Sequence, residues 1–245
     1  MEVRRIFVDK LKMKNGMVVV TGPNHKYIVS VLRKEAGDRV DLIDGKGYLY
    51  RCVISSVKGK ELYLQVMDVV HHPEEKRPKV TLFVSPIKGP RMDWLVEKAT
   101  ELGVERIVPT LFKRTVVKTP EGRSSKSERW RKISIEASRQ CGRCSIPEVL
   151  EPIPLRGIVQ YVDGCKHRWM LYEKERKRHL RDVLGPKVSG EICVAVGPEG
   201  GFEDAEATWL KEQGFLTLTL GENILRTETT PLVVLAIIFY ELGRR

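Results

Sequence analysis

The sequence predicts an α/β protein built on a mostly parallel sheet, preceded by a small β-barrel. After residue 78, apolar strands alternate with amphipathic helices, whereas the preceding segment contains short strands separated by glycine turns. The chain has 245 residues, 42% hydrophobic and 31% charged, which is long enough for one or two well-packed domains. A polar stretch with two prolines, His71–Pro78, separates the two patterns. We therefore expect domains over residues 1–72 and 73–245.

Short β-rich segments predict five strands in the first domain. They are Arg5–Val8, Met17–Val20, Val40–Ile43, Tyr48–Val57 and Glu61–Val69. Glycine-containing turns at residues 44–47 and 58–60 favour tight hairpins between the last three strands. One helix is expected over Lys26–Lys34, where apolar residues recur at spacings of three and four. Short strands with a single helix indicate a small barrel of the OB or pseudouridine-synthase-associated (PUA) kind.

The second domain begins with a continuous apolar strand, Val80–Val84, and further strands follow along the chain. They are Arg106–Pro109, Arg168–Tyr172, Ile192–Val196 and Thr217–Leu220. Helices are expected between them, over 92–102 with Gly103 as a left-handed C-cap, over Ser127–Arg139 and over Asp204–Gln213. A last helix should begin at Thr229-Thr230-Pro231, with a threonine N-cap and proline at the first helical position. Strands that are apolar throughout indicate a parallel sheet covered by helices on both faces.

The charge balance favours a polyanionic partner. The chain carries 43 Lys and Arg against 32 Asp and Glu, a net charge of +11, although a surface adapted for solubility explains this excess equally well. Lys113–Arg143 contains 10 basic and 3 acidic residues, a net +7, which favours RNA phosphates over an ordinary solvated helix face. A second basic stretch, Lys174–Arg181, could extend the same surface.

Cysteine usage and hydropathy point away from secretion, metal binding and membranes. Five cysteines in a chain of this length do not make a disulfide scaffold. Cys141 and Cys144 have CxxC spacing, but zinc would require a second ligand pair, and a thioredoxin-like site would not follow a basic helix. Leu232–Tyr240 is too short to span a bilayer, and the first residues lack the apolar core of a signal peptide. We expect a cytoplasmic protein with neither metal nor membrane partners.

Two glycine-containing loops are the best candidates for ligand binding. Val196–Asp204 follows an apolar strand and precedes a helix, which is where open parallel sheets bind ligands. It matches neither the Walker nor the dinucleotide fingerprint. Leu220–Thr230 repeats the layout and contains Arg226 and Glu228. Each loop alone could be an ordinary turn, and the two charged residues could be a surface ion pair, but together the loops could form the walls of one pocket.

Taken in order, these segments resemble the bacterial ribosomal RNA small subunit methyltransferase E family, the 16S rRNA uridine-N3 methyltransferases of the SPOUT class. The matching motifs are HKYIVSVLR (25–33), KGPRMDW (88–94), EKATELGV (97–104), EASRQCGR (136–143), GPEGGF (197–202) and ILRTET (224–229). GPEGGF alone marks only the class, whereas KATELGV together with ILRTET is much more specific.

The resemblance implies a PUA-like RNA-binding barrel followed by a methyltransferase domain with a deep trefoil knot that binds S-adenosylmethionine. It implies a homodimer that methylates N3 of a uridine in 16S ribosomal RNA of the small subunit. The catalytic candidates are then Glu199, Arg226 and Glu228. The residues expected to hold the cofactor are Leu171, Tyr172, Val196, Gly197, Glu199, Gly200, Gly201, Leu220, Gly221, Ile224 and Leu225. Those expected to contact RNA are Arg4, Arg5, His25, Arg33, Lys88, Arg91, Arg129, Arg139 and Arg143.

Two alternatives remain open. Another SPOUT enzyme could methylate a ribose 2′-hydroxyl, although the KATELGV and ILRTET segments argue against it. A non-catalytic RNA-binding factor for ribosome assembly would suit the basic first domain, but it would not need a complete pair of cofactor loops.

Overall fold

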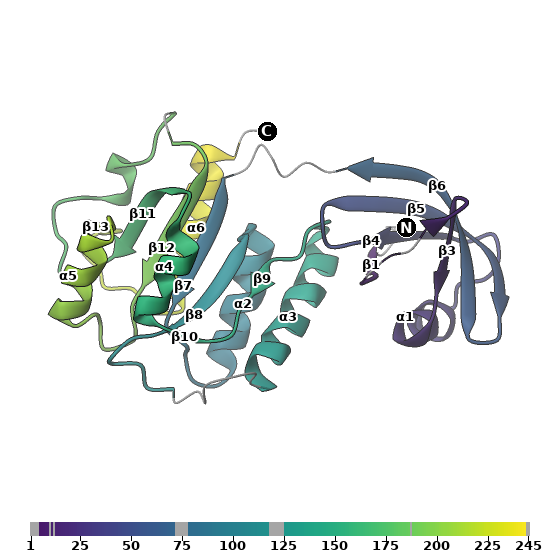
Figure 1. The fold of residues 1–245 in the computed structure, drawn as a ribbon, viewed down its shortest axis with the longest axis horizontal. Coiled ribbons are helices and arrows are strands. Elements are labelled where there is room, and N and C mark those ends of the chain that lie inside the picture. The colour runs from purple at the N-terminus through teal and green to yellow at the C-terminus, as the bar shows by residue number, and fades with distance from the viewer. Residues whose placement is uncertain are drawn as a thin grey trace. The chain divides into compact units, whose positions relative to one another are not determined.

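The chain forms two compact units, seen in a computed structural model that describes residues 5–9, 11, 13–71, 78–117, 125–186 and 188–243 (Figure 1). One unit comprises Met1–Glu74 with Ile135–Ile146, and the other comprises Glu75–Ser134 with Pro147–Arg245. Residues 72–77, which contain most of the expected linker and the expected domain boundary, lie outside the described residues. The N-terminal unit therefore includes a segment from the middle of the chain.

The N-terminal unit is a six-stranded sheet in the order β1-β4-β5-β6-β3-β2. Its strands are β1 (Arg5–Phe7), β2 (Met13–Lys14), β3 (Met17–Val20), β4 (Arg39–Ile43), β5 (Tyr48–Lys58) and β6 (Glu61–His71). Among the described strand pairs of this sheet, only β1 and β4 run parallel. Ile6 of β1 and Val18 of β3 belong to the same buried core although their strands lie far apart in the sheet order, so the sheet curves around that core. The five predicted strands are present, and β2 is an addition.

The predicted helix of this unit begins earlier than expected. Helix α1 spans Gly22–Lys26 and continues as a π-helical turn over Tyr27–Val31, so the predicted start at Lys26 is wrong. Pro23 lies in the first turn, where its missing N–H group would have no partner within the helix. The predicted hairpin between β5 and β6 is confirmed, and Gly59 supplies its positive φ of 59°.

A parallel sheet of seven strands organises the second unit. The order is β10-β8-β7-β12-β11-β13, with β9 beside β8, and every pairing is parallel. The strands are β7 (Lys79–Val84), β8 (Arg106–Leu111), β9 (Glu148–Val149), β10 (Ile153–Pro154), β11 (Cys165–Leu171), β12 (Glu191–Val196) and β13 (Leu216–Leu218). The prediction of a parallel sheet is confirmed, and the two-residue strands β9 and β10 are additions to it.

Helices cover both faces of this sheet (Figure 1). Along β7, Leu82 faces one core and Phe83 the other, because successive side chains of a strand point to opposite faces. The first core is closed by α2 (Pro90–Leu102), α6 (Thr229–Leu242) and Trp130 of α3 (Ser125–Cys141). The second is closed by the 3-10 turn Leu155–Ile158, α4 (Val159–Val162) and α5 (Asp204–Glu212). The prediction of helices on both faces is therefore confirmed.

The helix ends show which capping predictions hold. Gly103 ends α2 with a φ of 110°, and its N–H donates to the carbonyls of Ala99 and Thr100, as predicted for a left-handed C-cap. The predicted N-cap of the last helix is wrong, because α6 already begins at Thr229. The Thr230 hydroxyl donates back to the Arg226 carbonyl at 3.1 Å instead of accepting an N–H group. Helix α3 extends two residues beyond each end of its predicted range.

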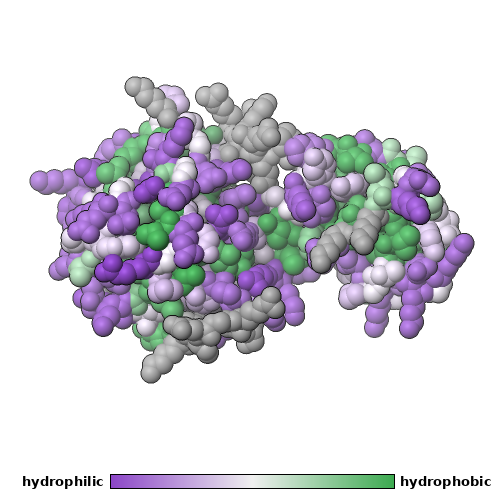
Figure 2. Space-filling model, in the orientation of Figure 1, coloured by the Kyte–Doolittle hydropathy of each residue, from purple (hydrophilic) through white to green (hydrophobic). Residues whose placement is uncertain are grey.

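The described cysteines form one disulfide, and the described residues offer neither a metal-binding group nor a membrane-spanning helix. Cys165 and Cys193 form one disulfide between β11 and β12, while Cys141 is free and exposed and Cys144 is free and buried. Within the described ranges, no group of three or more His, Cys, Asp or Glu side chains could hold a metal ion. No helix in those ranges is long and apolar enough to cross a membrane. Hydrophilic side chains cover much of the face shown in Figure 2, with smaller apolar areas between them.

Candidate active site

A cavity of about 530 Å³ lies at the carboxyl ends of three neighbouring strands. Strands β12, β11 and β13 are adjacent and parallel, so the loops that follow them meet at one edge of the sheet. The walls come from residues 171–173 and 176, from residues 196–201, and from residues 218–221 and 223–228, with Arg91 and Thr230 added. Its volume lies within the range of small-molecule sites in proteins.

The cavity gathers the residues that the sequence singled out. All eleven predicted cofactor residues line it, together with the catalytic candidates Arg226 and Glu228. Among the residues that sequence reasoning missed are Glu173, Arg176 and Thr219, although each lies in or beside a predicted segment. Arg91, one of the predicted RNA contacts, also lines the cavity. Glu173, Arg176 and Thr219 could have been predicted from their positions at or after the ends of the predicted strands. No local sequence pattern predicts that Arg91 of α2 lines the cavity.

The loop after β12 is fixed by close packing around its glycines. Gly201 has a φ of 71°, and a Cβ atom at this position would overlap the Glu173 carboxylate. Phe202 is buried and packs edge-on against Phe112, with ring centroids 5.2 Å apart. Arg114 Nη1 donates to the Gly200 carbonyl at 2.8 Å. These contacts hold the loop from outside, so its backbone can approach a ligand closely.

The loop after β11 is a turn built around one carboxylate. Glu175 accepts a hydrogen bond from the Thr217 hydroxyl of β13 at 2.6 Å. It also accepts the N–H groups of Arg176, Lys177 and Arg178, at 3.0, 2.9 and 3.3 Å. The hydroxyl bond, followed by the backbone bonds, lowers the pKa of Glu175 to about 2. An ionised carboxylate therefore ties this loop to the neighbouring strand.

Two carboxylates share one guanidinium inside the cavity. Arg91 Nη1 lies 2.5 Å from Glu199 Oε1 and 3.6 Å from Glu228 Oε1, and the bond to Glu199 is the main reason why the pKa of Arg91 is raised. Glu228 is only 7% exposed, and its Oε2 atom is buried with no hydrogen-bond partner among the described residues. A buried polar atom without a partner is costly, so this oxygen marks a position for a ligand or a proton.

Arg226 is an unpaired cation at the same cavity. Its side chain is exposed and forms no ion pair or hydrogen bond in the part of the chain that the structure describes. Among the described residues its backbone carbonyl is engaged, by the N–H groups of Thr229 and Thr230 and by the Thr230 hydroxyl. The interpretation of Arg226 and Glu228 as an ordinary surface ion pair is therefore wrong, because the acidic residue is buried and its nearest cation is Arg91.

The two remaining RNA candidates of the second unit are Lys88, just before α2, and Arg129 on α3. Lys88 is exposed immediately before α2. Arg129 of α3 is exposed, and its Nη2 atom lies 2.5 Å from Asp93 Oδ2 of α2. A surface ion pair of this kind is weak enough to exchange its carboxylate for a phosphate. The basic segment that contains Arg129 also includes residues 118–124, which lie outside the described residues.

The RNA candidates of the N-terminal unit differ in their accessibility. Arg139 is half-buried and donates to Glu136 at 2.6 Å, and Arg143 is only 9% exposed. Arg33 is exposed with a φ of 52°, a conformation that is uncommon outside glycine. The other two described candidates are half-buried, Arg5 and His25. Arg4 lies outside the described residues.

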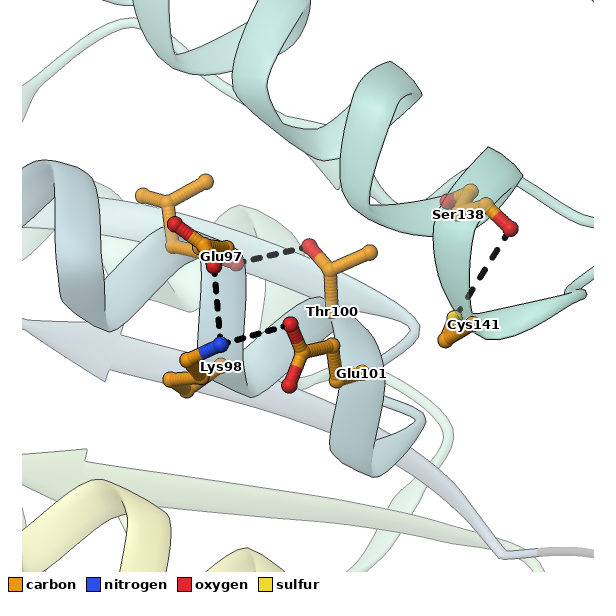
Figure 3. Close-up of polar contacts among 7 residues, drawn as sticks. Glu97, Lys98, Thr100, Glu101, Ser138 and Cys141 are labelled. Carbon is orange, nitrogen blue, oxygen red and sulfur yellow. Dashed lines mark hydrogen bonds and ion pairs between the residues drawn. The ribbon is translucent and has the colours of Figure 1, made fainter.

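The motif EKATELGV stabilises α2 and is absent from the described lining of the cavity. Figure 3 shows Lys98 between Glu97 and Glu101, with Nζ–Oε1 distances of 2.8 and 2.7 Å. Both carboxylates raise the pKa of Lys98, Glu101 more than Glu97. The buried Thr100 hydroxyl donates to the Val96 carbonyl one turn earlier. This motif therefore serves the helix that carries Arg91 to the cavity.

Comparisons with known proteins decide the family. The RNA methyltransferase domain matches residues 73–239, and the RNA methyltransferase PUA domain matches residues 20–67. Ribosomal RNA small subunit methyltransferase E of Bacillus subtilis (strain 168) is 31% identical over 228 residues, which cover 91% of this chain and 89% of that protein. The chain belongs to the ribosomal RNA small subunit methyltransferase E family. It is a methyltransferase with an N-terminal PUA domain, as the sequence predicted.

Solved structures of similar proteins contain the cofactor. A ribosomal RNA small subunit methyltransferase E from Neisseria gonorrhoeae, bound to S-adenosylmethionine, has a TM-score of 0.83 at 29% identity, with 98% of both chains covered. A protein of Legionella pneumophila, described as a methyltransferase and solved with the same cofactor, has a TM-score of 0.85 at 30% identity, again with 98% of both chains covered. The predicted cofactor of this methyltransferase E family member, S-adenosylmethionine, is confirmed.

The cavity of this protein suits that cofactor. Its volume of about 530 Å³ and its glycine-containing walls permit close backbone contact with a nucleoside. Two acidic residues, Glu199 and Glu228, line the cavity, and carboxylates of this kind suit the positive sulfonium of such a cofactor. The unpartnered Oε2 atom of Glu228 gives the site a polar group that the described residues leave unsatisfied.

Proposed function

We propose that this enzyme methylates N3 of a specific uridine in the 16S ribosomal RNA of the small subunit. One observation carries the proposal: the buried Glu228 carboxylate has an oxygen without a donor among the described residues in the cofactor cavity, which the unpaired cation Arg226 also lines. A reaction at uracil N3 requires a proton acceptor and a cation for the developing negative charge, and these two residues offer both.

The proton at uracil N3 must leave before the nitrogen can form a new bond. Its lone pair becomes available only as the imide anion forms, so a base has to act at this position. Glu228 Oε2 accepts that proton, in a setting where burial excludes competing water. The Arg226 guanidinium donates hydrogen bonds to the uracil oxygens on which negative charge develops. Since N3 lies on the pairing edge, the uridine must be unpaired or extruded.

S-adenosylmethionine supplies an electrophilic methyl group on a positively charged sulfur. The backbone of residues 197–201 and 220–225 would hold its adenine, ribose and methionine portions. Arg91 orients the two carboxylates, because it contacts both Glu199 and Glu228. Holding donor and acceptor in one geometry is the main source of rate in a two-substrate displacement.

The exposed apolar side chains of α2 and α6 support a homodimer, which is part of the proposal. Glu241 is the one charged residue in Thr229–Leu242, and Tyr240 on the same helix is 84% exposed. Helix α2 packs against the same core as α6. Its Trp94 side chain lies outside that core and is 44% exposed. Large exposed aromatic residues are typical of protein interfaces. The exposed Arg33, Lys88 and Arg129 remain the proposed RNA contacts.

The test is methyl transfer from labelled S-adenosylmethionine to small subunits that lack the modification, with stripped 16S rRNA in parallel. Digestion and mass spectrometry then identify the labelled nucleoside. We expect N3-methyluridine. A methylated ribose would replace the proposal with 2′-O methylation. The absence of transfer despite cofactor binding would refute 16S RNA as the substrate, and the absence of cofactor binding would favour an assembly factor.

A further inference from the structure

The loop after β11 presents three successive basic side chains, Arg176, Lys177 and Arg178, all exposed. None of the three forms an ion pair with an acidic residue in the described ranges, and Arg176 Nη1 donates only to two backbone carbonyls of its own loop, at 2.7 and 3.3 Å. The preceding cation differs, because Lys174 is paired with Asp204. Three adjacent positive charges are therefore left without compensation among the described residues.

Glu175 fixes the backbone of this loop without pairing with the three basic side chains. Its carboxylate accepts the backbone N–H groups of all three residues and the hydroxyl of Thr217. The acid lies next to the cations in sequence, but its hydrogen bonds are to main-chain groups and to β13. The basic side chains are thus displayed on a preformed turn, which reduces the entropy lost when a ligand orders them.

The same loop is attached to the wall of the cofactor cavity. The Thr219 N–H donates to the Arg178 carbonyl at 2.9 Å, and His179 forms a parallel bridge with Thr219. Both Thr219 and Arg176 line the cavity. Arg176 therefore stands at the cavity, and Lys177 and Arg178 follow it on a segment anchored to the same wall.

We propose that Arg176, Lys177 and Arg178 form a phosphate-binding surface that holds the RNA backbone next to the target nucleotide. The inference rests on the proposed function and adds a contact site for its substrate. A base that enters the cavity brings its flanking phosphates to the rim, where unpaired cations can bind them. Three consecutive cations on this turn suit the regular charges of a nucleic acid strand better than the scattered carboxylates of a protein.

The test uses the double substitution Lys177→Gln/Arg178→Gln in the full-length protein, which leaves the cavity-lining Arg176 in place. The matched control is Lys79→Gln/Lys166→Gln, because both lysines are exposed near the amino ends of β7 and β11, at the opposite edge of the same sheet. Binding to stripped 16S rRNA is measured as a function of salt, and methyl transfer to subunits is measured separately. Thermal melting and cofactor calorimetry verify that each variant is folded.

We expect the loop variant to raise KM for RNA about tenfold and to reduce the salt slope of RNA binding by about 1.4 to 1.8, which corresponds to two lost phosphate contacts. The maximal rate and the cofactor affinity should match those of the control. An unchanged salt slope would overturn the inference. A defect seen with subunits but not with stripped RNA would assign the loop to a ribosomal protein and also overturn it. RNA binding is measured without methyl transfer. A failure of this inference can therefore be distinguished from a failure of the proposed uracil-N3 reaction.

Discussion

Gly201→Ala is the sharpest test of how the cofactor cavity is built. The φ of 71° is unfavourable for alanine by about 1–2 kcal/mol. The new methyl group would also overlap the Glu173 carboxylate, which must then turn away. A total of about 1–3 kcal/mol predicts a fall in Tm of roughly 2–12 °C for a protein of this size. Because residue 201 lines the cavity, we expect S-adenosylmethionine affinity to fall about tenfold or more.

Gly164→Ala is the matched control for that substitution. Gly164 has a φ of 86°, and no atom lies within 4 Å of an added Cβ, so alanine brings the backbone strain without the overlap. Calorimetry should find wild-type cofactor affinity in this variant despite a lower Tm. Adding Glu173→Ala to Gly201→Ala should restore part of the lost affinity, because the overlapping carboxylate is gone. Wild-type affinity in Gly201→Ala itself would refute the placement of this loop against the cofactor.

Three further predictions concern charges around the cavity. Glu228→Gln should reduce single-turnover methyl transfer about 10²- to 10⁴-fold with the cofactor still bound, and a wild-type rate would exclude Glu228 as the base. Arg114→Ala removes the hydrogen bond to the Gly200 carbonyl, so calorimetry should show about three- to tenfold weaker cofactor binding, whereas unchanged affinity would mean that the loop is held by packing alone. Glu175 has a pKa of about 2 in the folded protein against an ordinary 4.5, so its stabilisation is complete above about pH 4.5 and is lost as the pH falls towards 2. The Tm difference between wild type and Glu175→Gln should therefore shrink between pH 7 and pH 3, and a constant difference would contradict this reasoning.

Several features of the fold and the site follow from local sequence patterns. The strands Val80–Val84 and Ile192–Val196 are apolar except for Thr81, because both of their faces are buried, and that pattern needs only neighbouring residues to be recognised. Once a parallel sheet is inferred, the loops that follow its strands must open at one edge. This geometric rule brings residues 196–201 and 220–225 together without any knowledge of distances.

Local patterns were weaker at helix ends. The start of α1 at Gly22 and the backward hydrogen bond of Thr230 both depend on how the preceding chain enters the helix. At the beginnings of α1 and α6, more than one residue could start the helix by local sequence rules, and packing decides which one does. The trefoil knot and the homodimer come from the family resemblance and stay predictions.

The ion pairs and hydrogen bonds between distant segments are visible only in the folded protein. Arg91 comes from α2, far from Glu199 and Glu228 in sequence, and leaves Arg226 unpaired among the described residues. Glu175 bonds to Thr217 of another strand and not to the basic side chains beside it. Consecutive residues were enough to predict the sheet, its two covered faces and the edge at which the cavity lies, because the periodicity of apolar residues is a local property of the chain. A pair one helical turn apart, such as Lys98 and Glu101, follows from local spacing, whereas pairs between distant segments depend on distances set by packing across the whole unit.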